Sequence, residues 1–264
     1  MLEQALYPTT SFPSRRVVTA IPRPDWPRRL TLPQFLDLHK DTPSHILGLG
    51  TCDDGLPVFF DLRDPRPGSL LLIGDSATGK TTLLRTMLAS GLAWNSPLEL
   101  NFAVVTARPE EYAVESQQTS YCRGVWDPFS IQTAHELVGL AELTEQRLAK
   151  PSSDITPILL ILEDLSTLRQ LDSGARLNLE WLFQNGPAAG VWPVATLRTA
   201  DALAMSRTAH YFGTHLLGKM SRLAAHRLAY GANLNTEALQ PGRQFAVQLN
   251  RSFLKFWLPQ PSME

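Results

Sequence analysis

The sequence predicts an α/β protein with a mostly parallel sheet, helices on both faces and a small N-terminal β-hairpin. Two observations support this fold class. From residue 69 onward, short apolar runs alternate with segments whose apolar residues have helical spacing, and this alternation is typical of parallel sheets covered on both sides. Before residue 69, two apolar runs flank an Asp-Asp-Gly turn, which is typical of a hairpin.

A short helix and the hairpin come first along the chain. Thr31–Leu38 is predicted to be helical, with its first residue as N-cap and Pro33 in the first turn. The hairpin is expected over residues 45–62. Asp53 and Asp54 lie between its strands, and we interpret them as turn residues rather than as a catalytic carboxylate pair.

The alternating region supplies the remaining elements. Ser130 is the expected N-cap of its longest helix, whose predicted apolar stripe consists of Ile131, Leu137, Val138, Ala141 and Leu148. Strands are predicted at 70–73, 101–106, 158–162, 190–196, 245–249 and 253–258, helices at 82–88, 130–150 and 177–183, and a further set of elements at 206–211, 216–217 and 220–230.

The most specific motif lies between the first of these strands and its helix. Residues 74–81 match G-x-x-x-x-G-K-[ST] at every fixed position. The glycines allow backbone N–H groups to point at phosphate oxygens, and the helix start adds partial positive charge. We expect Lys80 to reach the β- and γ-phosphates of ATP and the Thr81 hydroxyl to bind Mg²⁺. The predicted nucleotide-binding residues are Gly74, Asp75, Ser76, Ala77, Thr78, Gly79, Lys80, Thr81 and Thr82.

A second acidic motif follows the apolar run 159–162. Glu163 and Asp164 end this predicted strand, and parallel strands deliver their carboxyl ends to the ligand crevice. We expect Glu163 to hold Mg²⁺ with Thr81, and Asp164 to orient the attacking water. Together with Lys80, these two carboxylates are the predicted catalytic residues. The alternative is that Asp164 only caps the segment that follows it.

Composition excludes few functions. The 264 residues carry a net charge of −1, so no overall charge bias favours a nucleic-acid partner. Apolar runs such as 158–162 are far shorter than the about 20 residues of a membrane helix, and we expect no membrane span. Cys52 and Cys122 lack metal-ligand spacing and are expected to be reduced thiols of a cytoplasmic protein.

The first 30 residues form a separate zone that is rich in proline and arginine. Proline at this density disfavours regular structure, so we predict an extended arm over residues 1–30 and the main domain over residues 31–264. The positive charge of the arm suits phosphate or an acidic partner. A solvated tail is the other interpretation.

Several segments resemble a known family in the right order. Residues 46–62 followed by the phosphate loop resemble the start of FtsK/SpoIIIE-type (HerA-like) motor domains, which the type VII secretion ATPases share. The resemblance covers roughly residues 30–258 and implies a P-loop NTPase fold of the RecA/FtsK-like, additional-strand type. Its later parts are Leu140, Leu143, Glu145 and Arg147 on the long helix, the turn 188–190 before residues 194–198, and residues 240–243 before a closing strand.

The resemblance implies an Mg-ATP-dependent ATPase that forms a ring or another homo-oligomer and moves DNA or polypeptide. DNA would be bound without sequence preference, through its phosphates. Arg198 follows the residues that resemble the sensor strand. A phosphate or interface role is one interpretation of it, and a residue without such a role is the other. His210 and His215 are interpreted as structural, and Trp181 and Trp192 as core residues.

Three departures from the family pattern leave a second function open. The acids occur as Glu163-Asp164 where the family has Asp-Glu, Leu197 replaces a glutamine, and Pro187 stands where family members often have an arginine that reaches a neighbour's ATP. These changes affect transition-state chemistry and leave ground-state phosphate binding intact. The alternative is therefore a weakly or non-hydrolysing, ATP-gated subunit of a larger complex with a protein partner.

Overall fold

The computed structural model describes residues 30–152, 154–228, 234–249 and 252–261. The predicted arm lies outside the described residues except for Leu30. The described strands are β1 Ile46–Thr51, β2 Pro57–Asp61, β3 Leu70–Gly74, β4 Asn101–Val105, β5 Cys122–Trp126, β6 Ile158–Leu162, β7 Val191–Arg198, β8 Thr214–Leu217, β9 Gln244–Leu249 and β10 Ser252–Trp257.

Helices connect these strands within the same described ranges. The α-helices are α1 Leu32–Leu38, α2 Lys80–Trp94, α3 Ala113–Ser116, α4 Ile131–Ala149, α5 Ser173–Asn185, α6 Thr199–Ala202, α7 Ser206–Ala209 and α8 Arg222–Arg227. Four 3₁₀ turns accompany them, namely η1 Pro109–Tyr112, η2 Thr167–Gln170, η3 Pro187–Ala189 and η4 Thr236–Ala238.

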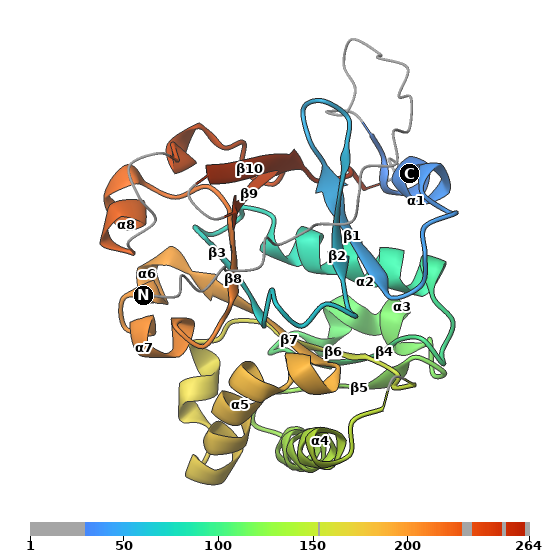
Figure 1. The fold of residues 1–264 in the computed structure, drawn as a ribbon. Coiled ribbons are helices and arrows are strands. Elements are labelled where there is room, and N and C mark those ends of the chain that lie inside the picture. The colour runs from blue at the N-terminus through green and yellow to red at the C-terminus, as the bar shows by residue number, and fades with distance from the viewer. Residues whose placement is uncertain (1–29, 153, 229–233, 250–251, 262–264) are drawn as a thin grey trace, which may run out of the picture.

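The described strands form one ten-stranded sheet in the order β2-β1-β10-β9-β8-β3-β7-β6-β4-β5 (Figure 1). From β8 to β5 every neighbouring pair is parallel, whereas the pairs from β2 to β8 are antiparallel. The predicted α/β class and the N-terminal hairpin are confirmed. Because β1 pairs with β10, the hairpin belongs to the same sheet as the phosphate loop.

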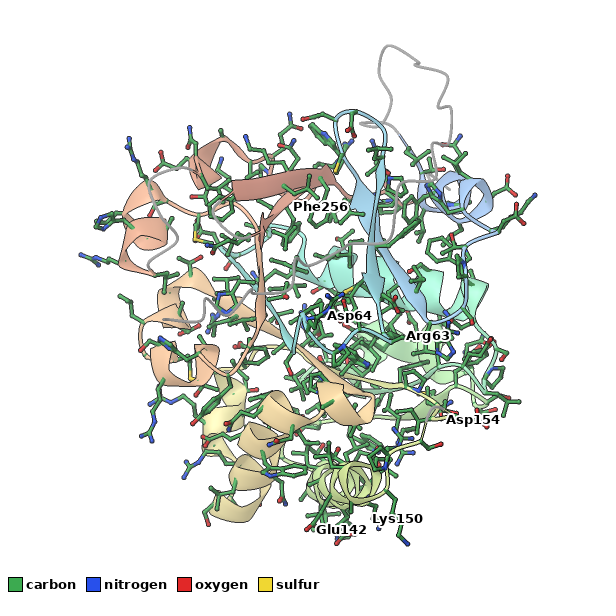
Figure 2. All side chains as sticks on the ribbon, viewed as in Figure 1. Arg63, Asp64, Glu142, Lys150, Asp154 and Phe256 are labelled. Atoms are coloured by element: carbon green, nitrogen blue, oxygen red, sulfur yellow. The ribbon has the colours of Figure 1, made fainter. Side chains whose placement is uncertain are left out.

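The sheet is buried on both faces, as its nearly continuous apolar strands predict. In β3, Leu70 and Leu72 pack with α2, whereas Leu71 and Ile73 face the core that α4 and α5 cover. Figure 2 shows the result: Phe256 lies inside the molecule, while Glu142 and Lys150 extend from the outer side of α4.

The predicted apolar stripe of the long helix is largely wrong. Ile131 is 62% exposed and Val138 41% exposed, whereas the buried face holds Thr133 and Thr144 with Leu137 and Leu140. The two threonine hydroxyls donate to the carbonyl oxygens of Asp127 and Leu140, each at 2.7 Å. A search for apolar residues alone misses such a face, because a threonine whose hydroxyl is bonded locally can be buried at little cost.

Strand β5 was not predicted. Its sequence, Cys-Arg-Gly-Val-Trp, has little apolar alternation, and none of its residues is fully buried. It forms the edge of the sheet beside β4, and Arg123 pairs with Glu136 of α4. Pairing with a neighbour and an ion pair thus stabilise a strand whose own pattern is weak.

Helix α1 is fixed to the sheet by an aromatic cluster. The Phe35 ring is fully buried against Trp94 of α2, with ring centroids 5.7 Å apart. A Cβ at Gly48 would lie 2.5 Å from the Phe35 ring, so this strand position needs glycine. At the start of the helix, the N–H of Leu32 donates to the backbone carbonyl oxygen of Gln260 at 2.7 Å, and this bond joins the first described segment to the last. None of the helices in the described ranges is long and apolar enough to cross a membrane.

Replacing Phe35 tests how much this cluster stabilises the fold. We expect Phe35→Ala to lower the free energy of unfolding by about 3–5 kcal/mol, because it removes a fully buried ring and leaves a cavity. Chemical denaturation followed by circular dichroism measures the change. Leu38→Ala is the matched control, since Leu38 lies on the same helix but is 50% exposed; a loss below about 1 kcal/mol for Phe35→Ala would contradict the assignment.

One buried and two half-buried histidines should make stability depend on pH. Burial lowers the pKa of His39, His45 and His215 below the ordinary value of 6.5. The unfolded chain therefore binds protons first as the pH falls, and the free energy of unfolding should decrease from about pH 6.5 downward. Denaturation at several pH values should show a smaller decrease for His39→Leu than for the wild type. His135→Gln, at an exposed position of α4, should retain the wild-type decrease, and an unchanged decrease in His39→Leu would refute a contribution from His39.

Candidate functional site

The loop between β3 and α2 turns through the left-handed region at one of its two motif glycines, Gly79, and at Ala77. Gly74 has no such φ angle and instead needs glycine because a Cβ there would lie 2.7 Å from Thr78 Oγ1. Gly79 has a φ of 92° and Ala77 a φ of 58°, both in the left-handed region. Such residues turn neighbouring backbone N–H groups inward and create a concave anion site. A Cβ at Gly79 would lie 2.9 Å from the Cα of Gly242, so both the φ angle and the available space require glycine.

The start of α2 fits an anion as well. Its N-cap is Gly79, no side chain accepts a hydrogen bond from its first turn, and that turn contains no acidic residue. The first N–H groups of a helix need an acceptor, and together with the helix dipole they attract phosphate. The helix start therefore fits the phosphate group that the motif predicts.

Lys80 points back into this loop. Its Nζ donates to the carbonyl oxygens of Gly74 at 2.9 Å and Asp75 at 2.8 Å. Burial lowers the pKa of the Lys80 ammonium, because removing a charge from water disfavours the charged form. An anionic group beside this ammonium would offset that effect.

Glu163 is the central carboxylate of the site. It is 6% exposed, and it accepts hydrogen bonds from Thr81 Oγ1 to Oε1 and from Thr106 Oγ1 to Oε2, both at 2.8 Å. Hydroxyl and carboxylate oxygens suit Mg²⁺, which binds through one or two carboxylates and completes its shell with water and substrate phosphates. Among the described residues, no group of three His, Cys, Asp or Glu side chains could hold a metal alone. The Thr81–Glu163 pair thus fits magnesium that arrives with a nucleotide.

Asp164 makes a different set of contacts from Glu163. Its φ is 59°, and its Oδ1 accepts hydrogen bonds from the backbone N–H and the hydroxyl of Ser166. Its backbone N–H donates to Thr196 Oγ1 at 2.9 Å, and its Oδ2 lies 3.8 Å from Arg198 Nε. In this conformation Asp164 caps the following turn, which is the alternative that the sequence left open, although it still borders the same cavity.

These groups surround one cavity of about 510 Å³ at the carboxyl ends of the parallel strands. Three cations, Lys80, Arg108 and Arg198, face it together with the two carboxylates, so its charge suits a polyanion that brings a divalent cation. Its size is within the range of small-molecule sites. The lining residues are Ser76, Ala77, Thr78, Gly79, Lys80, Thr81, Thr82, Arg108, Glu163, Asp164, Thr196, Arg198 and Gly242.

Most of the predicted site residues therefore line the same cavity. Two predicted residues do not line it, and two residues of the site were not predicted. Gly74 and Asp75 shape the loop through their carbonyl oxygens but do not line the cavity. The sequence analysis missed Thr106 and Arg108. Thr106 ends the predicted strand 101–106, and Arg108 lies two residues beyond that end. The shared edge of a parallel sheet was the signal that could have identified them.

The unusual Leu197 and Pro187 lie away from the cavity lining. Leu197 is fully buried in the core shared by α4 and α5, because side chains alternate along β7. Its neighbours Thr196 and Arg198 both face the cavity. Pro187 is buried in η3, beside Ala189, whose carbonyl oxygen accepts a bond from Arg147 at 3.0 Å.

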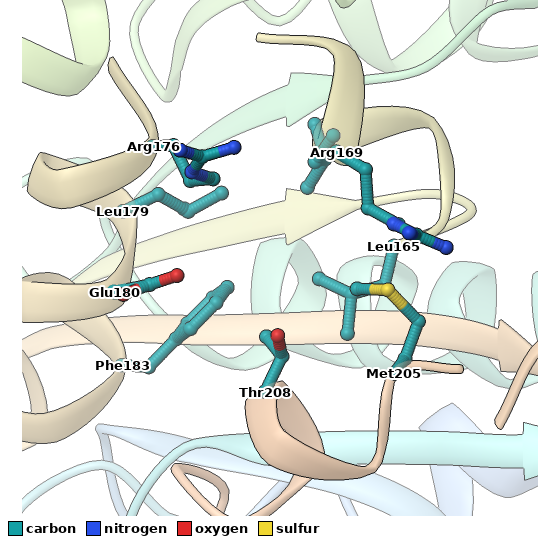
Figure 3. A pocket seen from close by; sticks show the side chains of 9 residues that line it. Leu165, Arg169, Arg176, Leu179, Glu180, Phe183, Met205 and Thr208 are labelled. Carbon is teal, nitrogen blue, oxygen red and sulfur yellow. The ribbon is translucent and has the colours of Figure 1, made fainter. Parts of the chain in front are cut away.

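A second hollow lies between η2, α5 and α7 (Figure 3). Its volume is about 30 Å³, far below the about 300 Å³ at which small-molecule sites begin. Arg169 and Arg176 border it above an apolar floor that includes Leu179 and Phe183. It is too small for a nucleotide and lies apart from the phosphate loop.

Comparison with solved structures identifies the fold. The cytoplasmic domain of the Thermomonospora curvata type VII secretion ATPase EccC matches with a TM-score of 0.68 and 16% identity over 90% of this chain and 28% of that chain. ATPases 2 and 3 of the same EccC, in complex with a signal sequence peptide, match with a TM-score of 0.67 and 16% identity over 90% of this chain and 44% of that chain. ATPases 2 and 3 of Geobacillus thermodenitrificans EssC match with a TM-score of 0.71 and 14% identity over 92% of this chain and 49% of that chain.

A protein of another system has the same fold. The pCW3 conjugation coupling protein TcpA, in a monomer form with ATPγS, matches with a TM-score of 0.68 and 15% identity over 88% of this chain and 70% of that chain. No protein-family model and no curated protein matches the sequence. The chain spans 28% to 49% of the EccC and EssC chains that it matches. It therefore has the P-loop ATPase fold of the EccC and EssC modules and of TcpA, as the resemblance to FtsK/SpoIIIE-type domains implied.

Proposed function

We propose that this chain binds Mg-ATP in the cavity at the start of α2. The arrangement of Lys80, Thr81 and Glu163 is the observation that carries the proposal, because it combines an ammonium group, a hydroxyl and a carboxylate beside an uncapped helix start. The ATPγS complex of TcpA, which has the same fold, supports a nucleoside triphosphate as the ligand.

Each residue would have a distinct role. The N–H groups of the loop and of the first turn of α2 would donate to phosphate oxygens, and Lys80 would exchange its two carbonyl partners for the β- and γ-phosphates. Thr81 and Glu163 would hold magnesium, which neutralises phosphate charge when it is bound. Arg198 would face the phosphates from the end of β7.

We further propose that the chain acts as an ATPase module of the FtsK/HerA type, in a ring or another homo-oligomer in the cytoplasm. Asp164 would then orient the attacking water after its side chain leaves Ser166. The cargo would be DNA or polypeptide. The signal-peptide complex of EccC supports a polypeptide and the conjugation role of TcpA supports DNA, and a DNA contact through phosphates would weaken steeply with salt.

One observation favours the second candidate function, an ATP-gated subunit that hydrolyses slowly. Asp164 is held by Ser166 and lies near Arg198, so the group expected to activate water is occupied. In this case ATP would shift assembly or partner binding through its different affinity for two states.

Removal of the Lys80 ammonium tests nucleotide binding. We expect Lys80→Ala to weaken ATPγS affinity by roughly 10-fold to 100-fold at millimolar magnesium, because charge-assisted hydrogen bonds to phosphate are lost. Isothermal titration calorimetry measures the affinity. Lys40→Ala is the control, since Lys40 is an exposed lysine in the turn after α1 and does not line the cavity. Equal affinities in the wild type and Lys80→Ala would disprove this site.

Substitution of the two acids separates the candidate functions. If the chain is an ATPase, Asp164→Asn should lower kcat by roughly 10²-fold to 10⁴-fold with little change in ATPγS affinity, while Glu163→Gln should weaken magnesium-dependent binding. Phosphate release measures the rate, and Asp154→Asn, at an exposed position, serves as the control. If the wild type already hydrolyses as slowly as Asp164→Asn, the gated subunit is favoured over the ATPase.

A further inference from the structure

Two arginines face the nucleotide cavity from opposite sides of the acid pair. Arg198 ends β7 and Arg108 follows β4, while β6, which carries Glu163 and Asp164, lies between these two strands. The sequence suggested a phosphate or interface role for Arg198 as one interpretation, and none for Arg108. Nothing in the roles described above uses Arg108, although its guanidinium is in the same cavity as Lys80.

The backbone of Arg108 is fixed to the central carboxylate. Its N–H donates to Thr106 Oγ1 at 3.1 Å, and the Thr106 hydroxyl donates in turn to Glu163 Oε2 at 2.8 Å. Pro109 begins η1 directly after it, and that turn is anchored by the fully buried Tyr112 ring. The point from which the Arg108 side chain extends is therefore rigidly placed relative to Glu163.

The guanidinium of Arg108 is paired with a carboxylate that another anion can replace. Its Nη1 lies 2.5 Å from Glu111 Oε1, and its Nη2 lies 4.0 Å from Glu163 Oε2. The Arg108 side chain is 56% exposed and that of Glu111 is 31% exposed. An exposed ion pair of this kind contributes little to stability, so a stronger anion in the cavity can replace Glu111 at small cost.

We propose that Arg108 binds the terminal phosphate of the nucleotide within the same chain, with Glu111 as its resting partner. A guanidinium donates two parallel hydrogen bonds to phosphate oxygens, and Arg108 rests beside the carboxylate that would hold the phosphate-bound magnesium. The proposal rests on the proposed function. It supplies from within the chain a cation that Pro187 cannot provide, and it gives the site a means to distinguish ATP from ADP.

The affinities for ATPγS and ADP test this role. Arg108→Ala should weaken ATPγS binding by roughly 10-fold to 100-fold and ADP binding by less than about threefold, because only the triphosphate carries the group that Arg108 contacts. Arg108→Lys should retain part of the preference, and added guanidinium chloride should restore part of it to Arg108→Ala. Calorimetry at fixed magnesium measures all of these affinities.

Two further variants sharpen the comparison. Arg85→Ala is the matched control, since Arg85 also pairs with a glutamate, Glu115 at 3.9 Å, but does not line the cavity. Glu111→Gln should strengthen ATPγS binding without affecting ADP, because it frees the guanidinium. Thermal melting checks that each variant is folded.

The outcomes separate this inference from the proposed function. If the wild type binds both nucleotides but Arg108→Ala weakens both equally, or neither, the role of Arg108 is refuted and the nucleotide site stands. If the wild type binds neither nucleotide, both proposals fail.

Discussion

The buried carboxylate of Glu163 is the contact on which the arrangement of the site depends. It accepts one hydrogen bond from α2 through Thr81 and one from the end of β4 through Thr106, while it extends from β6. These two bonds hold the ends of α2, β4 and β6 in fixed positions relative to one another. A buried carboxylate with both oxygens bonded is strongly favoured over one without partners, so the phosphate loop, the acid pair and Arg108 keep fixed positions relative to one another.

The charges around this carboxylate explain why the cavity suits a triphosphate. Lys80 is bonded to loop carbonyl oxygens, and the helix start has no side-chain cap. The two arginines form ion pairs with nearby acids. Arg108 pairs with Glu111, and Arg198 Nε lies 2.9 Å from Asp201 Oδ2. Each cation therefore has a partner that a phosphate can replace. Such temporary pairing lets a site remain stable without ligand and still gain favourable contacts when a polyanion binds.

Much of the fold followed from sequence pattern, because the parallel strands are buried on both faces and therefore appear as continuous apolar runs. The hairpin, α1 with its cap and the phosphate loop were predictable from local chemistry. Strand β5 was not, since pairing with β4 and the Arg123–Glu136 contact stabilise it rather than its own residues. The buried face of α4 was missed because two threonines occupy it.

The site was predictable in its motifs and less so in its details. The Thr81–Glu163 contact agrees with the expected pairing of the two motifs. The orientation of Asp164 depends on Ser166 and on the Thr196 hydroxyl from another strand, so the order of the two acids alone could not reveal it. Arg108 lines the cavity, and Thr106 bonds Glu163, only because β4 lies beside β6. This placement is a property of strand order and not of any local pattern.

The contact between Thr31 and Gln260 has a mechanical consequence. The two residues form a parallel bridge, flanked by hydrogen bonds from Leu32 N to the Gln260 oxygen and from Gln260 N to the Leu30 oxygen. A force that pulls the backbone of Leu30 toward the N-terminus and that of Gln260 toward the C-terminus would slide the two parallel segments past each other. Both bonds would then be loaded at once in shear rather than broken one after the other, so the bridge can resist pulling better than its two hydrogen bonds suggest.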